Sequence, residues 1–245
     1  MKNFESSVAF VSGANRGLGL AFVKGLLEAG ATKVYAGARD VASLVNLVSE
    51  SEGKVVPVEL DVTDKEGVFS AAGACTDVNL VINNAGIATY DSLTNAKESD
   101  NARQEMEVNY FGALNMVRAF SPVLKQQGGG TFVSVSSIAG LVNFPFFASY
   151  SVSKAAVHSL VQGVRAELAN QNTLVMGVYP GPIETEMTTN LPIDKASTEE
   201  VVAKVLEGIL KGDEDVFPDA TSMQISAGLN ADAKGMEKHI ASLGA

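Results

Sequence analysis

The part of the sequence that decides the fold is Ser12-Gly13-Ala14-Asn15-Arg16-Gly17-Leu18-Gly19. It lies between a short apolar run, residues 8–11, and a pattern typical of an amphipathic helix. Because glycines lack side chains, such a turn approaches a pyrophosphate closely, and a helix N-terminus favours its negative charge. The spacing Gly-x3-Gly-x-Gly differs from the Gly-x-Gly-x2-Gly of the standard dinucleotide fingerprint. A tight turn that binds nothing is the alternative, but the strand–turn–helix context favours a dinucleotide site.

Outward from this turn, short β-branched runs alternate with longer helical patterns. This alternation is typical of βαβ units, and runs that are apolar at consecutive positions indicate strands covered by helices on both faces. We therefore predict one α/β domain over residues 1–245, a Rossmann fold with a doubly wound, seven-stranded parallel sheet flanked by helices. We expect strands at 8–11, 33–36, 55–58, 80–82, 131–135, 174–178 and 216–217, and helices at 18–29, 41–50, 65–74, 102–127, 149–170, 198–211 and 221–243.

Composition excludes several classes of protein. No stretch of the 245 residues reaches the roughly 18 apolar residues of a membrane-spanning helix, and the first apolar run is too short for a signal peptide. We expect a cytoplasmic protein without a membrane partner. A net charge of -10 disfavours nucleic-acid binding, because phosphate backbones are held by clustered Lys and Arg. With one cysteine, Cys75, and two histidines, the sequence predicts neither a disulfide nor a metal site.

Basic side chains follow the second expected strand. Sites that prefer NAD usually carry an acidic residue there, about 20 residues beyond the glycines, but here the segment is Gly37-Ala38-Arg39-Asp40. Arg39 and Arg16 are suited to clamp a 2′-phosphate, because guanidinium groups bind phosphate in a bidentate way. The sequence therefore favours NADPH/NADP+ over NADH. Asp40 keeps NAD open, although it is equally suited to cap the following helix.

Polar residues also follow the third and fourth strands, as Asp61-Val62 and Asn83-Asn84-Ala85-Gly86. The carboxyl ends of parallel strands meet at one edge of a sheet, so an adenosine would lie across both segments. Asp61 is suited to accept a hydrogen bond from the adenine amino group, and Asn83 to brace neighbouring backbone. Asp and Asn are also common turn residues, which is the alternative for both.

Tyr150 and Lys154 begin a long predicted helix, and their spacing of four places them on one face. An ammonium within ~6 Å of a phenol favours the phenolate and lowers its pKa from about 10. Alone, such a pair is more often a packed ring beside a solvated charge. The fifth strand, however, ends in Ser134-Val135-Ser136-Ser137. This places Ser137 near the same sheet edge, where its hydroxyl can stabilise negative charge on a substrate carbonyl oxygen during hydride transfer.

Taken together, these residues resemble the classical short-chain dehydrogenase/reductase family over nearly the whole chain. The resemblance rests on Gly13/Gly17/Gly19, Asn83-Asn84-Ala85-Gly86, Val108-Asn109-Tyr110-Phe111-Gly112, Ser137, Tyr150 with Lys154, and Pro180-Gly181-Pro182-Ile183-Glu184-Thr185. Within the family, Asn15-Arg16 and Ala38-Arg39 look like the NADPH-preferring carbonyl reductases.

The resemblance implies a role for each catalytic residue. It implies that Ser137, rather than Ser136, polarises the carbonyl, that Tyr150 delivers the proton, and that Lys154 lowers the tyrosine pKa while binding ribose. It also implies that Asn109 holds a water in a proton relay. The expected cofactor-binding residues, from the turn and the resemblance together, are Gly13, Asn15, Arg16, Gly17, Leu18, Gly19, Arg39, Asp61, Val62, Asn83, Ala85, Gly86, Tyr150, Lys154, Pro180, Gly181, Ile183 and Thr185.

The substrate side is less distinctive. Phe144 and Phe147 lie between Ser137 and Tyr150, and Met187 lies in a loop of about residues 184–197 that looks like a mobile flap. These side chains suggest an apolar or aromatic carbonyl substrate, although the rings are equally suited to the core or a subunit interface. Small residues on the helices 102–127 and 149–170 allow close packing, and similar family members form dimers or tetramers, so we expect a homodimer or homotetramer.

The sequence therefore predicts an NADPH-dependent oxidoreductase that reduces a ketone or aldehyde to an alcohol, reversibly, with Tyr150 as proton donor. One alternative is an NAD-dependent alcohol dehydrogenase of the same family. Another is a catalytically silent NADPH-binding sensor or scaffold. The complete set of Asn109, Ser137, Tyr150 and Lys154 argues against silence, because a pure binder has no need of Ser137 beside Tyr150.

Overall fold

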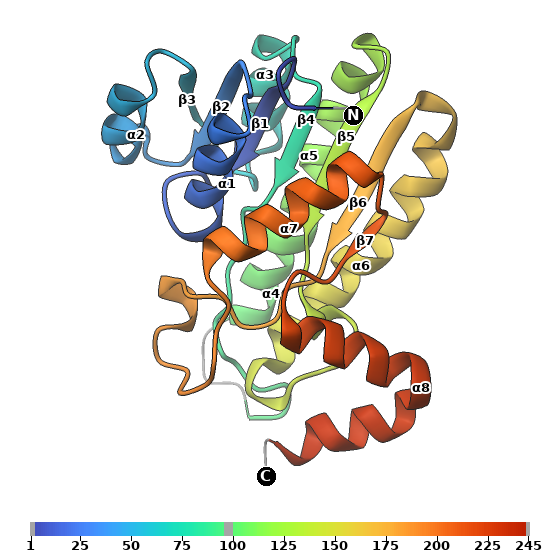
Figure 1. Ribbon diagram of the computed structural model, residues 1–245. Helices are drawn as coiled ribbons and strands as arrows, with labels where there is room; N and C mark the ends of the chain where they lie inside the picture. Colours follow the sequence, from blue (N-terminus) through green and yellow to red (C-terminus); the bar gives the residue numbers. More distant parts are fainter. Residues whose placement is uncertain (1–2, 96–99, 244–245) are drawn as a thin grey trace.

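The computed structural model describes residues 3–95 and 100–243, in which seven parallel strands form one sheet (Figure 1). Their order, β3-β2-β1-β4-β5-β6-β7, reverses between β1 and β4, where ligands bind in doubly wound folds. The predicted fold class is confirmed. The other residues of the predicted domain lie outside the described ranges. The strands are β1 (Val8–Ser12), β2 (Lys33–Ala38), β3 (Val55–Glu59), β4 (Leu80–Asn83), β5 (Gly130–Val135), β6 (Thr173–Val178) and β7 (Asp215–Val216).

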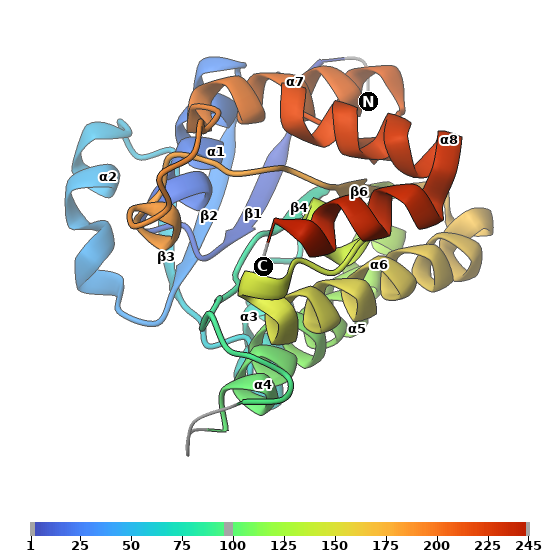
Figure 2. The ribbon, with the colours of Figure 1, turned by 90° about the horizontal axis from the view of Figure 1, so that it is seen from below.

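Helices cover both faces of the sheet, as the view from below shows (Figure 2). Alternate side chains of β1 point to opposite faces, so that Val11 packs with Phe22 in one apolar cluster and Phe10 with Phe120 in the other. Burial of each such side chain contributes about 1.5–3 kcal/mol. One face carries α1 (Gly17–Glu28), α2 (Val45–Glu50) and α7 (Thr198–Lys211), and the other carries α3 (Lys65–Ala74), α5 (Gly112–Gln126) and α6 (Ala148–Leu168).

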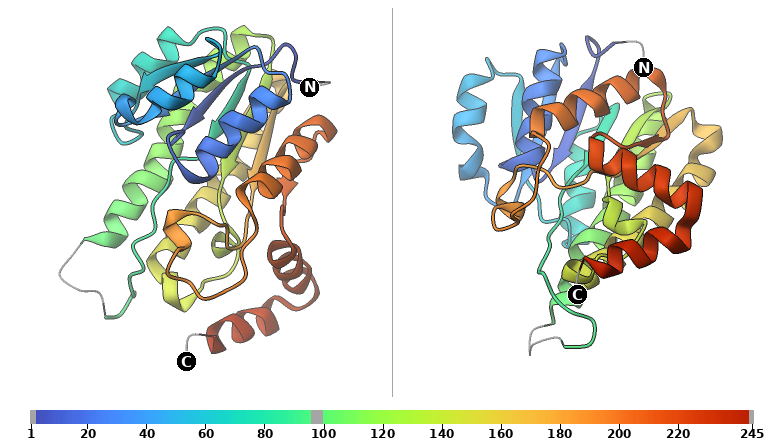
Figure 3. Two further views of the ribbon diagram at one scale, coloured as in Figure 1. Left: turned by 60° about the vertical axis from the view of Figure 1, so that its left-hand side comes forward. Right: turned by 60° about the horizontal axis from the view of Figure 1, so that its bottom comes forward.

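The last helix, α8 (Ala220–Ser242), lies at the end of the molecule to which the strands point (Figure 3). It is bent at Asp232, whose backbone is not helical and whose carboxylate accepts a hydrogen bond from the Gly235 amide at 2.9 Å. Its two halves bury Ile225 and Ile240 in a third apolar cluster that also contains Ile138. The helix therefore covers the segment that follows β5.

Two expected helices differ from the prediction in their first turns. The helix expected at 41–50 begins as the 3-10 helix η1 (Val41–Leu44), and the Asp40 side chain caps it by accepting from the Ala42 amide at 2.9 Å. The helix expected at 102–127 consists of α4 (Asn101–Glu105), a π-helical segment η2 (Met106–Phe111) and α5. Further 3-10 turns are η3 (Ile138–Gly140), η4 (Pro145–Phe147), η5 (Ala169–Gln171) and η6 (Glu186–Thr188). Nowhere in residues 3–95 or 100–243 is a helix long and apolar enough to cross a membrane.

Candidate active site

The glycine-rich turn lies after β1, where the strand order reverses. Gly13 and Gly17 have φ values of +66° and +51°, which residues with side chains rarely adopt. A Cβ at Gly19 would lie 2.0 Å from the carbonyl oxygen of Gly13, so the turn closes tightly on the start of α1. The turn thus presents backbone at a helix N-terminus, which is the arrangement that binds a pyrophosphate.

A hydrogen-bond network fixes this turn to the end of β4. The Ser12 hydroxyl accepts from the amides of Asn84 and Ala85, each at 3.0 Å, and the Asn84 side chain donates to the Ser12 carbonyl at 3.0 Å. The brace expected at Asn83 therefore lies one residue later, at Asn84. Asn83, the last residue of β4, is instead buried and donates to the Ser134 hydroxyl at 3.3 Å.

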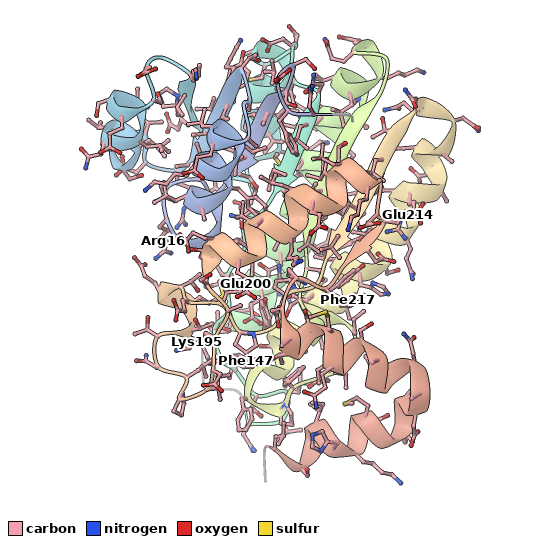
Figure 4. The ribbon with its side chains drawn as sticks, in the orientation of Figure 1. Arg16, Phe147, Lys195, Glu200, Glu214 and Phe217 are labelled. Atoms are coloured by element: carbon pink, nitrogen blue, oxygen red, sulfur yellow. The ribbon has the colours of Figure 1, made fainter. Side chains whose placement is uncertain are left out.

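The two arginines expected to bind the 2′-phosphate lie apart, each beside a different carboxylate. Burial acts to raise the pKa of Asp61, but hydrogen bonds from the Thr63 side chain and amide, together with the charge of Arg39, hold it below its usual value. Arg39 and Asp61 therefore lie near each other after β2 and β3. Arg16 forms an exposed ion pair with Glu186 of η6. Figure 4 labels Arg16 at the start of α1. A phosphate that used Arg16 would have to displace this carboxylate.

Tyr150 and Lys154 lie on one face of α6, as their spacing predicts. The Lys154 ammonium lies 5.7 Å from the centroid of the Tyr150 ring and donates to the Val135 carbonyl at 2.9 Å. Burial lowers the pKa of Lys154 to about 8. Burial also raises the pKa of Tyr150 to about 12, against the opposite effect of a hydrogen bond with Ser137. The net effect on Tyr150 is a raised pKa, in contrast to the lowering expected from Lys154.

The two serines after β5 have different contacts. The Ser137 hydroxyl bonds with the Tyr150 side chain, and it also accepts from the Ala139 amide at 3.1 Å. The Ser136 hydroxyl instead donates to the Lys154 carbonyl at 3.1 Å, inside α6. Ser137 is therefore the serine that lies beside the phenol, and Ser136 supports the helix that carries the phenol.

Asn109 is buried in the π-helical segment η2, and its side chain bonds to residues of other segments. Its oxygen accepts from the Ile87 amide at 2.8 Å, and its nitrogen donates to the Ile87 carbonyl at 2.9 Å and to the Ser153 hydroxyl at 2.8 Å. A Cβ at Gly86 would lie 3.1 Å from the Asn109 oxygen and 3.4 Å from the Lys154 ammonium. Gly86 thus leaves open the space next to two of the four expected catalytic residues.

The segment after β6 connects the catalytic serine to the glycine turn. The Pro180 carbonyl accepts from the Ile138 amide at 3.1 Å, and the Gly181 amide donates to Asp219 at 2.8 Å. Ile183 is buried, and the methyl of Thr185 lies 3.4 Å from where Gly17 would carry a Cβ. The remaining expected cofactor residues, Leu18 and Val62, are buried beside the turn and after β3, and Asn15 lies in the turn itself.

The three expected substrate residues separate into two groups. Phe147 packs against Tyr150, with ring centroids 6.2 Å apart, and Met187 is exposed in the loop after β6. Phe144 instead packs against the apolar cluster under α8, which was the alternative noted for it. The loop is closed at its base by the pairing of Ile183 with Ala196.

Two further residues of the site have no signal in the sequence. Tyr90 packs against Phe147, with ring centroids 4.7 Å apart, and its hydroxyl donates to the Met187 carbonyl. Glu105 is fully buried, and its charge acts to raise the pKa of Tyr150. A glutamate in a helical pattern, such as Glu105, predicts an exposed side chain. A tyrosine in a polar loop, such as Tyr90, predicts no particular contact.

The arrangement is suited to proton transfer at a carbonyl oxygen. Two hydroxyl donors, Ser137 and Tyr150, lie side by side, with a buried ammonium behind the phenol. The glycine turn lies at the same edge of the sheet and offers the backbone surface that a dinucleotide requires. In the described part of the chain, no group of three or more His, Cys, Asp or Glu side chains is placed to hold a metal ion.

Comparison with known proteins finds similarity to dehydrogenases and reductases along most of the chain. The family model of the short chain dehydrogenases matches residues 7–196. The chain is 33% identical over 244 residues to a trans-4-hydroxycyclohexanecarboxylate dehydrogenase of Sinomonas cyclohexanicum, covering 91% of this chain and 93% of that protein. It is 36% identical over 195 residues to a 3-oxoacyl-acyl-carrier-protein reductase of Thermotoga maritima, covering 77% and 78%.

One solved structure is similar to this chain in fold and sequence over almost the full length of both chains. It is a short chain dehydrogenase from Burkholderia cenocepacia in complex with NADP, 44% identical to this chain. The TM-score is 0.92, and the match covers 97% of this chain and 98% of the other. The similarity therefore extends to α7, β7 and α8, which lie beyond the residues matched by the family model.

Proposed function

The chain belongs to the short-chain dehydrogenase family, and from this premise we propose that it is an NADPH-dependent oxidoreductase that reduces a ketone or aldehyde to an alcohol, reversibly. The observation that carries the proposal is the contact of the Ser137 hydroxyl with the Tyr150 phenol, beside the buried Lys154. Neither a sensor nor a scaffold needs two hydroxyl donors at the edge of the sheet where the dinucleotide would lie. This arrangement favours catalysis over the silent alternative.

The proposed cofactor is NADP(H), which when bound supplies or accepts a hydride at its nicotinamide ring. The glycine turn fits the pyrophosphate, because side chains at Gly13, Gly17 and Gly19 would be strained or would clash. Arg39 and Arg16 are the proposed holders of the 2′-phosphate. The relative from Burkholderia cenocepacia, whose structure contains NADP, supports this choice. Asp40, which kept NAD open, uses its carboxylate to cap η1.

The chain's own residues then do the acid–base chemistry. As a hydride reaches the carbonyl carbon, negative charge develops on the carbonyl oxygen, and the Ser137 hydroxyl stabilises it by donating a hydrogen bond. The Tyr150 hydroxyl transfers its proton to that oxygen, which completes the alcohol. Lys154 stabilises the resulting phenolate and is proposed to bind the ribose. Asn109 is proposed to hold the water through which Tyr150 recovers a proton.

The reductive direction is supported by the state of the phenol. Because burial raises the pKa of Tyr150 to about 12, the residue is protonated at neutral pH and ready to act as a donor. Alcohol oxidation needs the phenolate instead, so it requires higher pH or a strong effect of the bound cofactor. A protonated phenol suits the role of proton donor in the proposed reduction. The apolar or aromatic character proposed for the carbonyl compound rests on Phe147 and Met187 beside the site.

We further propose a homodimer or homotetramer that assembles through α5 and α6. An open hollow between these helices is lined by Tyr110, Leu114, Ala156, Leu160 and Gly163. The same hollow is bordered by Arg118 and Glu167, whose opposite charges suit a two-fold interface. Light scattering at several protein concentrations measures this assembly directly.

The experiment that tests the function is a carbonyl panel. The purified chain is incubated with NADPH, and separately with NADH, and the loss of nicotinamide absorbance is recorded for aryl, alicyclic and aliphatic ketones and aldehydes. We expect carbonyl-dependent oxidation that is faster with NADPH. Binding of NADPH without carbonyl-dependent oxidation would instead support the sensor alternative.

A further inference from the structure

Residues 87–91 form an irregular segment that is held at two points by side chains of η2 and α4. Asn109 exchanges two hydrogen bonds with the backbone of Ile87, at 2.8 and 2.9 Å. Two residues later, one oxygen of Glu105 accepts from both the amide and the hydroxyl of Thr89, at 2.7 and 2.8 Å. These bonds fix the backbone on the N-terminal side of Tyr90.

Tyr90 has an unusual conformation for an aromatic residue. Its φ is +59°, in the left-handed region that large side chains rarely adopt, so the surrounding contacts must hold it there. Its side chain is 42% exposed, which makes it one of the larger apolar surfaces next to the site. The ring packs against Phe147, and the hydroxyl donates to the Met187 carbonyl of the loop. Tyr90 therefore bridges the loop after β6 and the start of α6.

Glu105 supports this bridge from inside the protein. It is fully buried, and of its two carboxylate oxygens only Oε1 has a hydrogen-bond partner among the described residues. A buried carboxylate with incomplete hydrogen bonding is costly, and such groups in native proteins need an explanation. The clamp on Thr89 supplies one, because it holds the backbone immediately before the strained residue.

We propose that Tyr90 is a specificity-determining residue for this site, with Glu105 as its positioning residue. Tyr90 and Phe147 form an aromatic wall that continues to Tyr150, whose ring centroid lies 6.2 Å from that of Phe147. The preferred substrates are carbonyl compounds with a flat aryl group next to the reacting carbon. This inference rests on the proposed carbonyl reduction and adds the substrate class.

The chemistry of the wall supports an aryl group over a saturated ring of equal size. Aromatic rings attract each other in tilted and edge-to-face arrangements. Each such pair raises binding affinity by about 2- to 10-fold more than the burial of apolar area alone would. Tyr90 and Phe147 already adopt a tilted arrangement, with 49° between their planes. A non-planar cyclohexyl group would bury comparable area but gain none of this attraction.

The test compares acetophenone with cyclohexyl methyl ketone, which have the same number of carbon atoms. For wild-type protein with NADPH we expect a higher kcat/KM for acetophenone. Tyr90→Ala should lower the ratio of the two kcat/KM values by about 3- to 10-fold, mainly through the KM for acetophenone. Tyr90→Phe keeps the ring and should keep the ratio, but faster hydrogen exchange at residues 186–189 should report the lost bond to Met187.

Glu105 is tested in parallel by two variants of similar size. Glu105→Gln keeps an acceptor for Thr89 and should keep the wild-type ratio, whereas Glu105→Leu removes the acceptor and should lower the ratio as Tyr90→Ala does. Tyr35→Phe is the matched control, because this tyrosine bonds with Asp77 and Lys33 away from the site. Thermal unfolding of each variant separates loss of folding from loss of specificity.

The outcomes distinguish this inference from the proposed function. If the wild-type protein reduces ketones and Tyr90→Ala leaves the ratio unchanged, the role of Tyr90 is wrong while the function stands. If Glu105→Gln and Glu105→Leu lower the ratio of the two kcat/KM values equally, the hydrogen bonds from Thr89 to Glu105 do not set the position of Tyr90. If the wild-type protein reduces no carbonyl compound, the proposed function fails and the specificity role fails with it.

Discussion

Lys154 donates a hydrogen bond from its ammonium to the carbonyl oxygen of Val135, the last residue of β5, at 2.9 Å. The side chain is only 4% exposed, and burial lowers its pKa from 10.5 to about 8. The cation is therefore held in position by a neutral acceptor rather than by a carboxylate. Its charge costs the apoprotein stability, and that cost can be measured.

We expect Lys154→Met to abolish turnover and yet raise the free energy of unfolding of the apoprotein at pH 7, by at most about 3 kcal/mol. Below pH 8 the lysine is charged in both states, so the folded state bears the full desolvation cost. Between pH 8 and 10.5 the folded state binds fewer protons than the unfolded state, so wild-type stability rises with pH and the difference shrinks. Urea unfolding at pH 7 and pH 10 tests this. An equal difference at both pH values would contradict it.

Tyr150→Phe should lower kcat by at least about 100-fold, which is the lower range for loss of a general acid. The ring and its contact with Phe147 remain, so the Kd for NADPH should change far less than kcat. Stopped-flow or steady-state assays give kcat, and nicotinamide fluorescence gives Kd in a chain that contains no tryptophan. A variant with wild-type turnover would show that another group supplies the proton.

Glu186→Gln should tighten NADPH binding by up to about 5-fold, because an exposed ion pair contributes about 0.2–1 kcal/mol. The 2′-phosphate then no longer competes with a carboxylate for Arg16. NADH, which lacks this phosphate, should bind as before. Glu184→Gln, an exposed change in the same loop, is the control and should alter neither Kd. Equal effects on both cofactors would place Arg16 away from the phosphate.

Gly19→Ala and Gly73→Ala form a contrasting pair. A Cβ at Gly19 would lie 2.0 Å from the Gly13 oxygen, so the substitution should cost about 1–3 kcal/mol of stability and weaken NADPH binding at least 10-fold. A Cβ at Gly73, on the exposed side of α3, would meet nothing within 4 Å. That substitution should stabilise the protein by about 0.5–1 kcal/mol without affecting binding. Thermal unfolding with and without NADPH measures both.

Much of the fold follows from local patterns in the sequence. The alternation of apolar strands and amphipathic helices predicts the parallel sheet, because each pattern depends on neighbours within a few residues. The same is true of Tyr150 and Lys154, whose helical spacing decides that they share a face. Ser197 likewise caps α7, a position that its residue type favours, with its hydroxyl accepting from the Glu200 amide at 3.1 Å.

The remaining features depend on tertiary contacts. The π-helical segment around Asn109 uses residues that an ordinary helix also accepts, so no local signal marks it. The choice of Asn84 over Asn83 as the brace depends on where β4 ends, and sequence patterns place strand ends only to within a few residues. Tyr90 and Glu105 acquire their roles from partners far away in the chain, such as Met187 and Thr89.

The loop after β6 meets the two halves of the site through different residues. Glu186 holds Arg16 on the side of the dinucleotide turn, and the Met187 carbonyl holds Tyr90 on the side of the aromatic wall. Neighbouring residues of one 3-10 turn, η6, thus contact both halves of the site. If a bound dinucleotide changes the affinity for the carbonyl compound through this turn, then by thermodynamic reciprocity a bound carbonyl compound changes the affinity for the dinucleotide. Any coupling between the two ligands through η6 therefore changes both affinities by the same factor.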